Sequence, residues 1–119
     1  MSIERSYYVI SGFDLTGFKT DKYDDWKWTN EGERFTCNQA KGEIQLFDDP
    51  MIGLHLYLGY IFSANDEYDF DTTKINYESF AFQKPYVINK LNELIDIGVI
   101  DRAILDYAKY EIIVFEECS

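Results

Sequence analysis

The stretch LHLYLGYIF, residues 54–62, is the most apolar part of the chain and decides its fold class. Side chains of an extended strand alternate between its two faces, so the stretch divides into two sets. One set is Leu56, Leu58, Tyr60 and Phe62, and the other is His55, Tyr57, Gly59 and Ile61. Both sets are largely apolar, which is typical of a strand covered on both sides. We therefore predict a central strand here.

Three shorter segments also have the composition of strands. Residues 7–10, 43–47 and 110–115 are rich in β-branched or aromatic residues, which favour extended backbone. The first of them runs toward a turn near Thr16 and Gly17.

Residues 43–47 alternate polar and apolar side chains. This pattern predicts that Ile44 and Leu46 face the core while Glu43 and Gln45 face water. The segment is followed by Asp48-Asp49-Pro50, and the proline favours a loop because it cannot donate to a sheet.

A helix is expected over about residues 85–97. Pro85 suits a first helical turn, and Gly98 suits a left-handed residue just after the last turn. Apolar residues recur between them at helical spacing, namely Val87, Ile88, Leu91, Leu94 and Ile95.

Two further predictions complete the secondary structure. Asp101 is expected to cap a second short helix over residues 102–108. The polar region 18–43 is expected to form a hairpin that turns near Glu31 and Gly32. The resulting fold class is α+β: a single domain over residues 1–119, with a mainly antiparallel sheet and helices packed on one face.

The charge of the chain restricts its partners. Its 119 residues include 22 acids and 11 lysines and arginines, for a net charge of −11, and 46% are hydrophobic. The hydrophobic fraction is high enough for a folded core. Nucleic acid and anionic membranes carry the same sign of charge as the protein, so neither is an expected partner, and a basic protein is.

The longest uncompensated acidic stretch lies between Lys41 and Lys74, which contains no lysine or arginine. We predict that its carboxylates bind the partner, in particular Asp48, Asp49, Asp66, Glu67, Asp69 and Asp71. In extended chain, residues two apart project to the same side at about 6.6 Å spacing, so Glu67, Asp69 and Asp71 would form a row of negative charges.

A second acidic and aromatic cluster, around Asp24, Asp25, Trp26 and Trp28, is predicted to contribute to the same binding function. Tryptophan is enriched among residues that dominate binding energy. We name Asp24, Asp25 and Trp26 as binding residues and expect one of the two tryptophans to be exposed.

Enzymatic chemistry is not expected. His55, the one histidine, lies in an apolar strand, and Cys37 and Cys118 have neither CxxC spacing nor companion histidines. From Asn65 the acidic stretch fails the calcium-loop pattern, because Phe70 and Asn76 stand where glycine and glutamate are required. We predict no cofactor and no metal, although a domain that binds a cation or small molecule remains an alternative.

In size and charge the chain resembles the small acidic inhibitors that bacteriophages encode against restriction or CRISPR nucleases, and bacterial immunity proteins that neutralise toxin nucleases. This resemblance matches no family motif and transfers no residue roles. It implies a DNA-mimicking inhibitor of a nuclease, acting in the cytoplasm, which is the host cytoplasm for a phage protein. A structural protein that assembles into homo-oligomers is the second alternative. The first residues lack the layout of a signal peptide, so secretion by that route is not expected.

Overall fold

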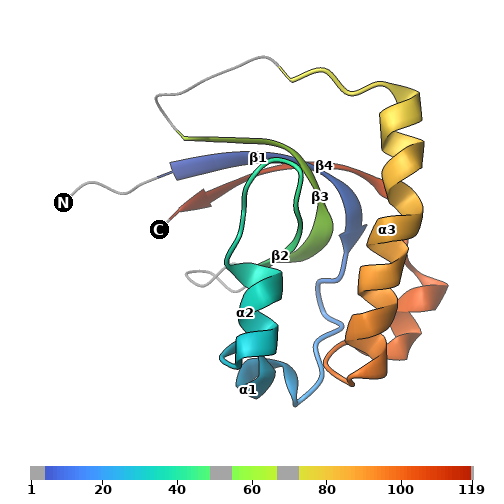
Figure 1. The fold of residues 1–119 in the computed structure, drawn as a ribbon. Coiled ribbons are helices and arrows are strands. Elements are labelled where there is room, and N and C mark those ends of the chain that lie inside the picture. Colours follow the sequence, from blue (N-terminus) through green and yellow to red (C-terminus); the bar gives the residue numbers. More distant parts are fainter. Residues whose placement is uncertain (1–4, 49–54, 67–72, 119) are drawn as a thin grey trace.

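One sheet of four antiparallel strands is present in the computed structural model, which describes residues 5–48, 55–66 and 73–118. The elements follow in the order β1 (Arg5–Asp14), α1 (Tyr23–Lys27), α2 (Asn30–Thr36), β2 (Ile44–Asp48), β3 (Leu56–Asp66), α3 (Tyr77–Asp96), the 3₁₀ helix η1 (Arg102–Asp106) and β4 (Glu111–Cys118). The strand order is β2-β3-β1-β4, and α3 covers one face (Figure 1). This arrangement confirms the α+β fold class.

The predicted central strand is confirmed as β3, which lies between β2 and β1. Leu56 and Leu58 on one face are 1% and 0% exposed, and Ile61 on the other face is 0% exposed. The strand extends to Asp66, beyond the apolar stretch that predicts it. The strands predicted near residues 7–10, 43–47 and 110–115 are also present, as β1, β2 and β4.

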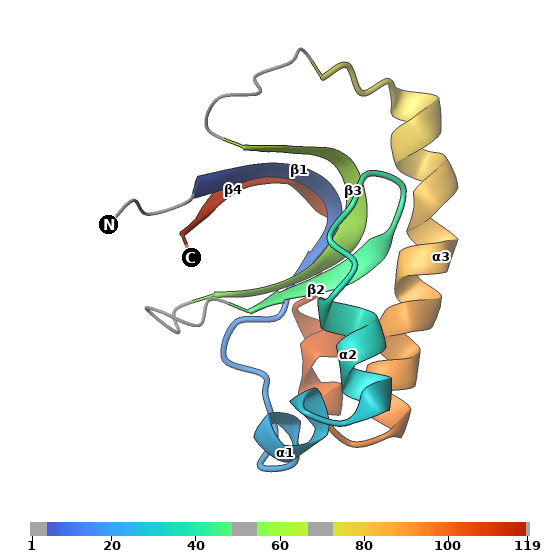
Figure 2. The ribbon, with the colours of Figure 1, turned by 60° about the vertical axis from the view of Figure 1, so that its left-hand side comes forward.

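The sheet is strongly bent, with α3 on its convex side (Figure 2). Gly12 of β1 lies directly opposite Gly59 of β3. A Cβ atom on Gly12 would collide with the carbonyl oxygen of Leu58 and lie 2.5 Å from Cα of Gly59. A register shift between Val9 and Ile10 adds a bulge two residues away, and bulges increase local bending. The close contact of two glycines therefore permits the bend.

The convex side carries the larger core. Four α3 residues at helical spacing are buried there, Val87, Leu91, Leu94 and Ile95. The helix begins at Tyr77, where the Asn76 side chain accepts a hydrogen bond of 2.8 Å from the Ser79 amide. The predicted start at Pro85 is therefore wrong, because an asparagine cap starts the helix earlier and the exposed proline is tolerated inside it. Gly98 follows the helix with φ +85°, as predicted.

A smaller, aromatic core fills the concave side. Its buried members are Tyr8, Ile10, Phe47 and Ile61. The rings of Tyr8 and Phe47 are 4.7 Å apart, and Phe115 of β4 is 5.0 Å from Phe47. Because both sides of the sheet are covered, alternation along a strand does not by itself separate buried from exposed residues.

Gln45 shows this limit. It was expected to face water, but it is 4% exposed. Its Nε2 donates a 2.9 Å hydrogen bond to the Arg34 carbonyl, and its Oε1 accepts one of 3.3 Å from the Asn38 amide. The prediction is wrong because α2 and the segment after it each offer the Gln45 amide one backbone partner.

The hairpin predicted within residues 18–43 is also wrong, since this region forms α1 and α2. Thr29 caps α2 by accepting a 3.1 Å hydrogen bond from the Gly32 amide. A Cβ on Gly32 would collide with the Trp26 carbonyl oxygen. The glycine thus allows two short helices to meet and does not mark a turn between strands.

Asp101 caps the short helix η1, as predicted, by accepting a 2.9 Å hydrogen bond from the Ala103 amide. Within the described ranges, α3 and the other helices lack the length and apolar character needed to cross a bilayer.

Gly12→Ala is expected to reduce the free energy of unfolding by about 3 kcal/mol or more, because its methyl group meets backbone atoms that cannot move aside. Gly17→Ala is the control. Gly17 has φ +87° with open space around it, so its substitution is expected to cost about 1 kcal/mol. Urea titration followed by circular dichroism measures both, and equal losses would contradict the glycine contact.

Candidate functional site

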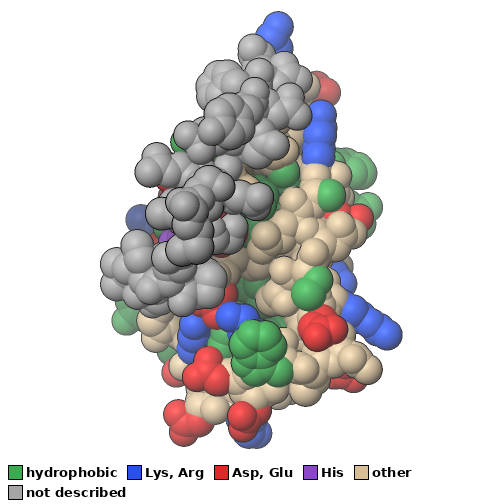
Figure 3. Space-filling model, turned by 90° about the vertical axis from the view of Figure 1, so that its left-hand side faces the viewer, with side chains coloured by type: hydrophobic (Ala, Val, Ile, Leu, Met, Phe, Trp, Pro, Cys, Tyr) green, Lys and Arg blue, Asp and Glu red, His purple; other side chains and the backbone are tan. Residues whose placement is uncertain are grey.

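Exposed carboxylates gather where α1 and α2 meet. We define the α1–α2 patch as Asp21, Asp24, Asp25, Glu31 and Glu33, together with Trp28; all six are exposed. Four of the acids stand in the first turns of the two helices, where negative charge interacts favourably with the backbone amides. Figure 3 shows acidic side chains at this lower end of the molecule, beside a hydrophobic one. The predicted residues Asp24 and Asp25 belong to this patch.

The two tryptophans differ in exposure. Trp26 turns inward, with its ring 5.8 Å from Tyr23 and 5.5 Å from Phe35. Trp28 is 76% exposed, and the Lys27 ammonium lies 5.4 Å from its ring centroid. Residues two apart lie on one face of a strand but about 200° apart on a helix. The helical backbone of α1 therefore explains why Trp28, and not the named Trp26, is the exposed aromatic residue.

Asp48 is held inside the protein by two lysines. Its Oδ1 is 3.0 Å from Lys19 Nζ and its Oδ2 is 3.1 Å from Lys27 Nζ, while its side chain is 8% exposed. Burial alone would raise the pKa of this carboxyl, but the hydrogen bonds and charges of the two lysines outweigh burial and lower it. We call this group the Asp48 clamp. It ties α1 and the preceding loop to the end of β2.

Tyr23 packs beside the clamp and is fully buried. Burial, followed by the negative charge of Asp48, raises the pKa of its phenol. The Lys19 ammonium lies 4.7 Å from the ring centroid. Although Asp48 is close enough for its charge to act, the phenol oxygen makes no hydrogen bond of standard geometry to the described residues. The phenol therefore stays protonated and contributes packing.

The other predicted binding residues lie outside the described residues or next to them. Asp49, Glu67, Asp69 and Asp71 are outside the described residues, and Asp66 is described only as the last residue of β3. The strand curves so that both of its ends lie on the side of the sheet opposite α3 (Figure 2).

His55 is packed against aromatic rings. Its ring stacks on Tyr57 at 4.6 Å with an interplanar angle of 3°, and its Nε2 is 3.8 Å from the Glu117 carboxylate.

No three histidine, cysteine or acidic side chains among the described residues are close enough to form a metal site. Cys37 is an exposed thiol.

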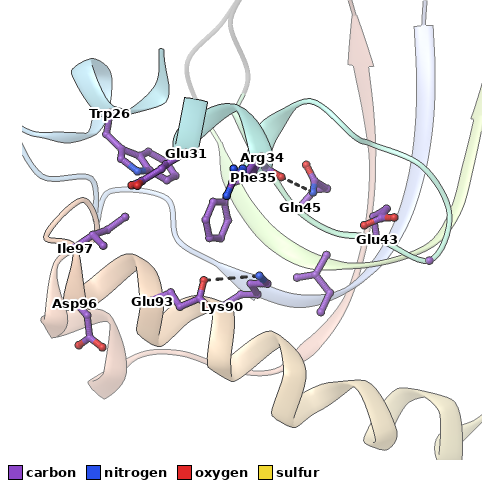
Figure 4. A pocket seen from close by; sticks show the side chains of 12 residues that line it. Trp26, Glu31, Arg34, Phe35, Glu43, Gln45, Lys90, Glu93, Asp96 and Ile97 are labelled. Atoms are coloured by element: carbon purple, nitrogen blue, oxygen red, sulfur yellow. Dashed lines mark hydrogen bonds and ion pairs between the residues drawn. The ribbon is translucent and has the colours of Figure 1, made fainter. Parts of the chain in front are cut away.

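A groove missed by sequence reasoning lies between α2, β2 and α3 (Figure 4). It has a volume of about 620 Å³, and its walls include Phe35, Ile44 and Ile97. Charged residues of both signs surround these side chains, among them Glu43, Lys90 and Glu93. Since the lining comes from three separate segments of the chain, spacing along the sequence gives no signal for it.

Comparison with protein-family models, with curated proteins and with solved structures finds no match to this chain.

Asp48→Asn is expected to reduce the free energy of unfolding by about 2 kcal/mol at pH 7. This loss is smaller than for a fully buried ion pair, because the two lysine side chains are partly exposed. Asp24→Asn, on the exposed patch, should change it by less than about 0.5 kcal/mol. Urea titrations of the two variants and the wild type measure both effects.

The clamp also predicts a pH dependence. The folded pKa of Asp48 lies below the unfolded value of about 3.9, so the stabilisation is fully present above that pH and is lost as pH falls through the folded pKa. The stability difference between wild type and Asp48→Asn should therefore narrow below about pH 4. A difference that stays constant from pH 7 to pH 2.5 would contradict a charge-based clamp.

Proposed function

We propose that this chain is a non-enzymatic acidic protein that binds the basic, nucleic-acid-binding surface of another protein, with a cytoplasmic nuclease as the expected partner. The observation that carries the proposal is the α1–α2 patch, an exposed group of carboxylates around an exposed tryptophan. The resemblance in size and charge to phage-encoded nuclease inhibitors and to immunity proteins points the same way.

The patch keeps a negative charge because the acids near it outnumber the cations. Lys19 and Lys27 are both bound by Asp48. Lys22 and Arg34 also lie near the five carboxylates. With Asp48 included, six negative charges stand against four positive ones, which leaves an excess of two negative charges. A basic groove that binds duplex DNA is built for about one negative charge per 1.7 Å of helix axis. An acidic patch would therefore be attracted to the same groove.

Charge and aromatic contact would contribute to different steps of binding. Carboxylates accelerate association and pair with lysine or arginine at the contact. Trp28 offers a large, rigid apolar surface within the patch, and such residues commonly dominate the lifetime of a complex. The sequence-based prediction adds Glu67, Asp69 and Asp71 as a second acidic segment of the same surface.

Affinity capture with charge-reversed variants tests the proposal. Immobilised wild type, incubated with nuclease-treated lysate of the source or its host, should retain a basic nucleic-acid-binding protein at 50 mM salt. Association should slow by about tenfold or more at 500 mM salt. Asp24→Lys with Asp25→Lys should remove most of the captured protein, as measured by quantitative mass spectrometry.

Glu78→Lys with Glu111→Lys is the matched control, because it changes net charge equally at exposed positions outside the patch. A triple change of Glu67, Asp69 and Asp71 to lysine tests the second acidic segment. Equal loss of binding in the patch variant and the control would mean that net charge alone matters. Retention of the same proteins by every variant would contradict the proposal.

Self-association is a second candidate function, favoured by exposed aromatic residues on α3. Phe82 and Tyr86 are 62% and 50% exposed, with their rings 5.6 Å apart. Beside Phe82 lies a hollow of about 410 Å³ that Tyr60 and Phe62 of β3 also line. Apolar surface of this kind commonly forms interfaces.

If this surface joins two copies, light scattering should give a dimer mass that is unchanged between 50 and 500 mM salt. Phe82→Glu should then give a monomer, because burial of the added charge opposes association. The acidic-inhibitor proposal expects no such salt-insensitive oligomer. A monomeric wild type at 100 μM would rule out the second candidate.

A further inference from the structure

The groove between α2, β2 and α3 combines aromatic walls with negative charge. The side chains of Trp26 and Phe35 form part of one wall (Figure 4), and Ile44 of β2 also lines the groove. Its volume of about 620 Å³ falls in the range of about 300 to 1,000 Å³ that is usual for ligand sites. The groove is therefore large enough for a side chain together with the backbone that carries it.

Carboxylates outnumber cations around the groove. The four acids that line it are Glu31, Glu43, Glu93 and Asp96, and the two cations are Arg34 and Lys90. Lys90 is engaged by Glu93, at 3.7 Å between Nζ and Oε2. The groove is thus electrostatically suited to a positively charged occupant, and unsuited to a phosphate or a carboxylate.

The protein already places a cation against the aromatic wall. The Lys90 ammonium lies 5.3 Å from the centroid of the Phe35 ring, within the range of a cation–π interaction. Its side chain and that of Glu93 are 42% and 56% exposed, and such exposed pairs contribute little stability. The position over Phe35 therefore accepts positive charge, and its present occupant is held weakly.

We infer that this groove receives an arginine side chain of the partner, which displaces Lys90 from Phe35 and pairs with Glu93 and Glu43. The inference rests on the proposed function in one respect, that the partner is a basic protein. Arginine fits better than lysine because its planar guanidinium stacks on aromatic rings and binds carboxylates through two parallel hydrogen bonds. Glu31 and Trp26 belong both to the groove lining and to α1 or α2, so an arginine bound here would lie beside the α1–α2 patch.

Binding of a small probe tests the inference without any partner protein. N-acetyl-arginine-N-methylamide, titrated to 50 mM, should produce saturable NMR shifts in the Phe35 ring, the Ile44 methyls and the Trp26 indole. The citrulline analogue has the same shape without the charge and should bind at least about fivefold more weakly. Equal binding of both probes, or shifts confined to residues outside the groove, would overturn the inference.

Three variants test the direction in which affinity for the arginine probe changes. Lys90→Ala should increase the affinity for the arginine probe about threefold, because it removes the competing cation. Glu43→Gln with Glu93→Gln should reduce it about fivefold or more. Glu111→Gln is the control, since Glu111 is an exposed acid of β4 that belongs neither to the groove lining nor to the α1–α2 patch, and it should leave affinity unchanged. Circular dichroism verifies that each variant is folded, and Lys90→Ala that weakens binding would contradict displacement.

The outcomes separate this inference from the proposed function. Capture of a basic protein that depends on Asp24 and Asp25, together with no saturable binding of the arginine probe, overturns only the groove. Specific probe binding without any captured basic partner overturns the proposed function and the basic partner as the source of the arginine, and supports only the preference of the groove for arginine.

Discussion

The arrangement of the candidate surface depends on one buried carboxylate. Asp48, at the last position of β2, binds Lys19 and Lys27 at 3.0 and 3.1 Å. These two contacts attach α1 and the loop before it to the sheet, and they pair two lysines with an internal carboxylate. In a protein with 22 acids and 11 bases, the position of each lysine strongly affects the local field. The internal use of Lys19 and Lys27 leaves the acids of α1 and α2 with few compensating cations.

The bent sheet supplies the scaffold. Gly12 and Gly59 let two backbones meet where side chains would prevent it, and the sheet consequently has a convex side covered by α3 and an aromatic concave side. The groove beside β2 exists because α2 and α3 approach this edge of the sheet from different directions (Figure 4). The exposed acids, Trp28 and the groove therefore lie in neighbouring parts of one folded unit. This proximity is the physical basis for proposing that they bind one partner.

Sequence reasoning found the elements whose apolar pattern is long and regular. Strand β3 and the buried face of α3 follow directly from residues 56–62 and 87–95. Helices α1 and α2 were missed because segments of five and seven residues are too short to show a repeating helical pattern of apolar residues. In addition, Gly32 was interpreted as the turn of a hairpin. The start of α3 was missed because the cap at Asn76 precedes a first turn without apolar periodicity.

The candidate site was predicted only in part, for a related reason. Asp24 and Asp25 are exposed as expected, but the exposure of Trp28 in place of Trp26 depends on a helix that the sequence does not reveal. The lysine partners of Asp48 lie 29 and 21 residues away along the chain, and no local pattern links them. No local pattern predicts the groove either, because Phe35, Glu43 and Lys90 come together only after folding.

The central claim is that the acidic surface occupies the place of nucleic acid on its partner. Fluorescence anisotropy of a labelled DNA duplex, bound to the captured partner, measures this directly. The account predicts that added protein releases the duplex and that the apparent Kd of the DNA rises linearly with the protein concentration, as for two ligands of one site. A ternary complex, in which the partner holds both the DNA and this protein with unchanged affinity, would contradict it.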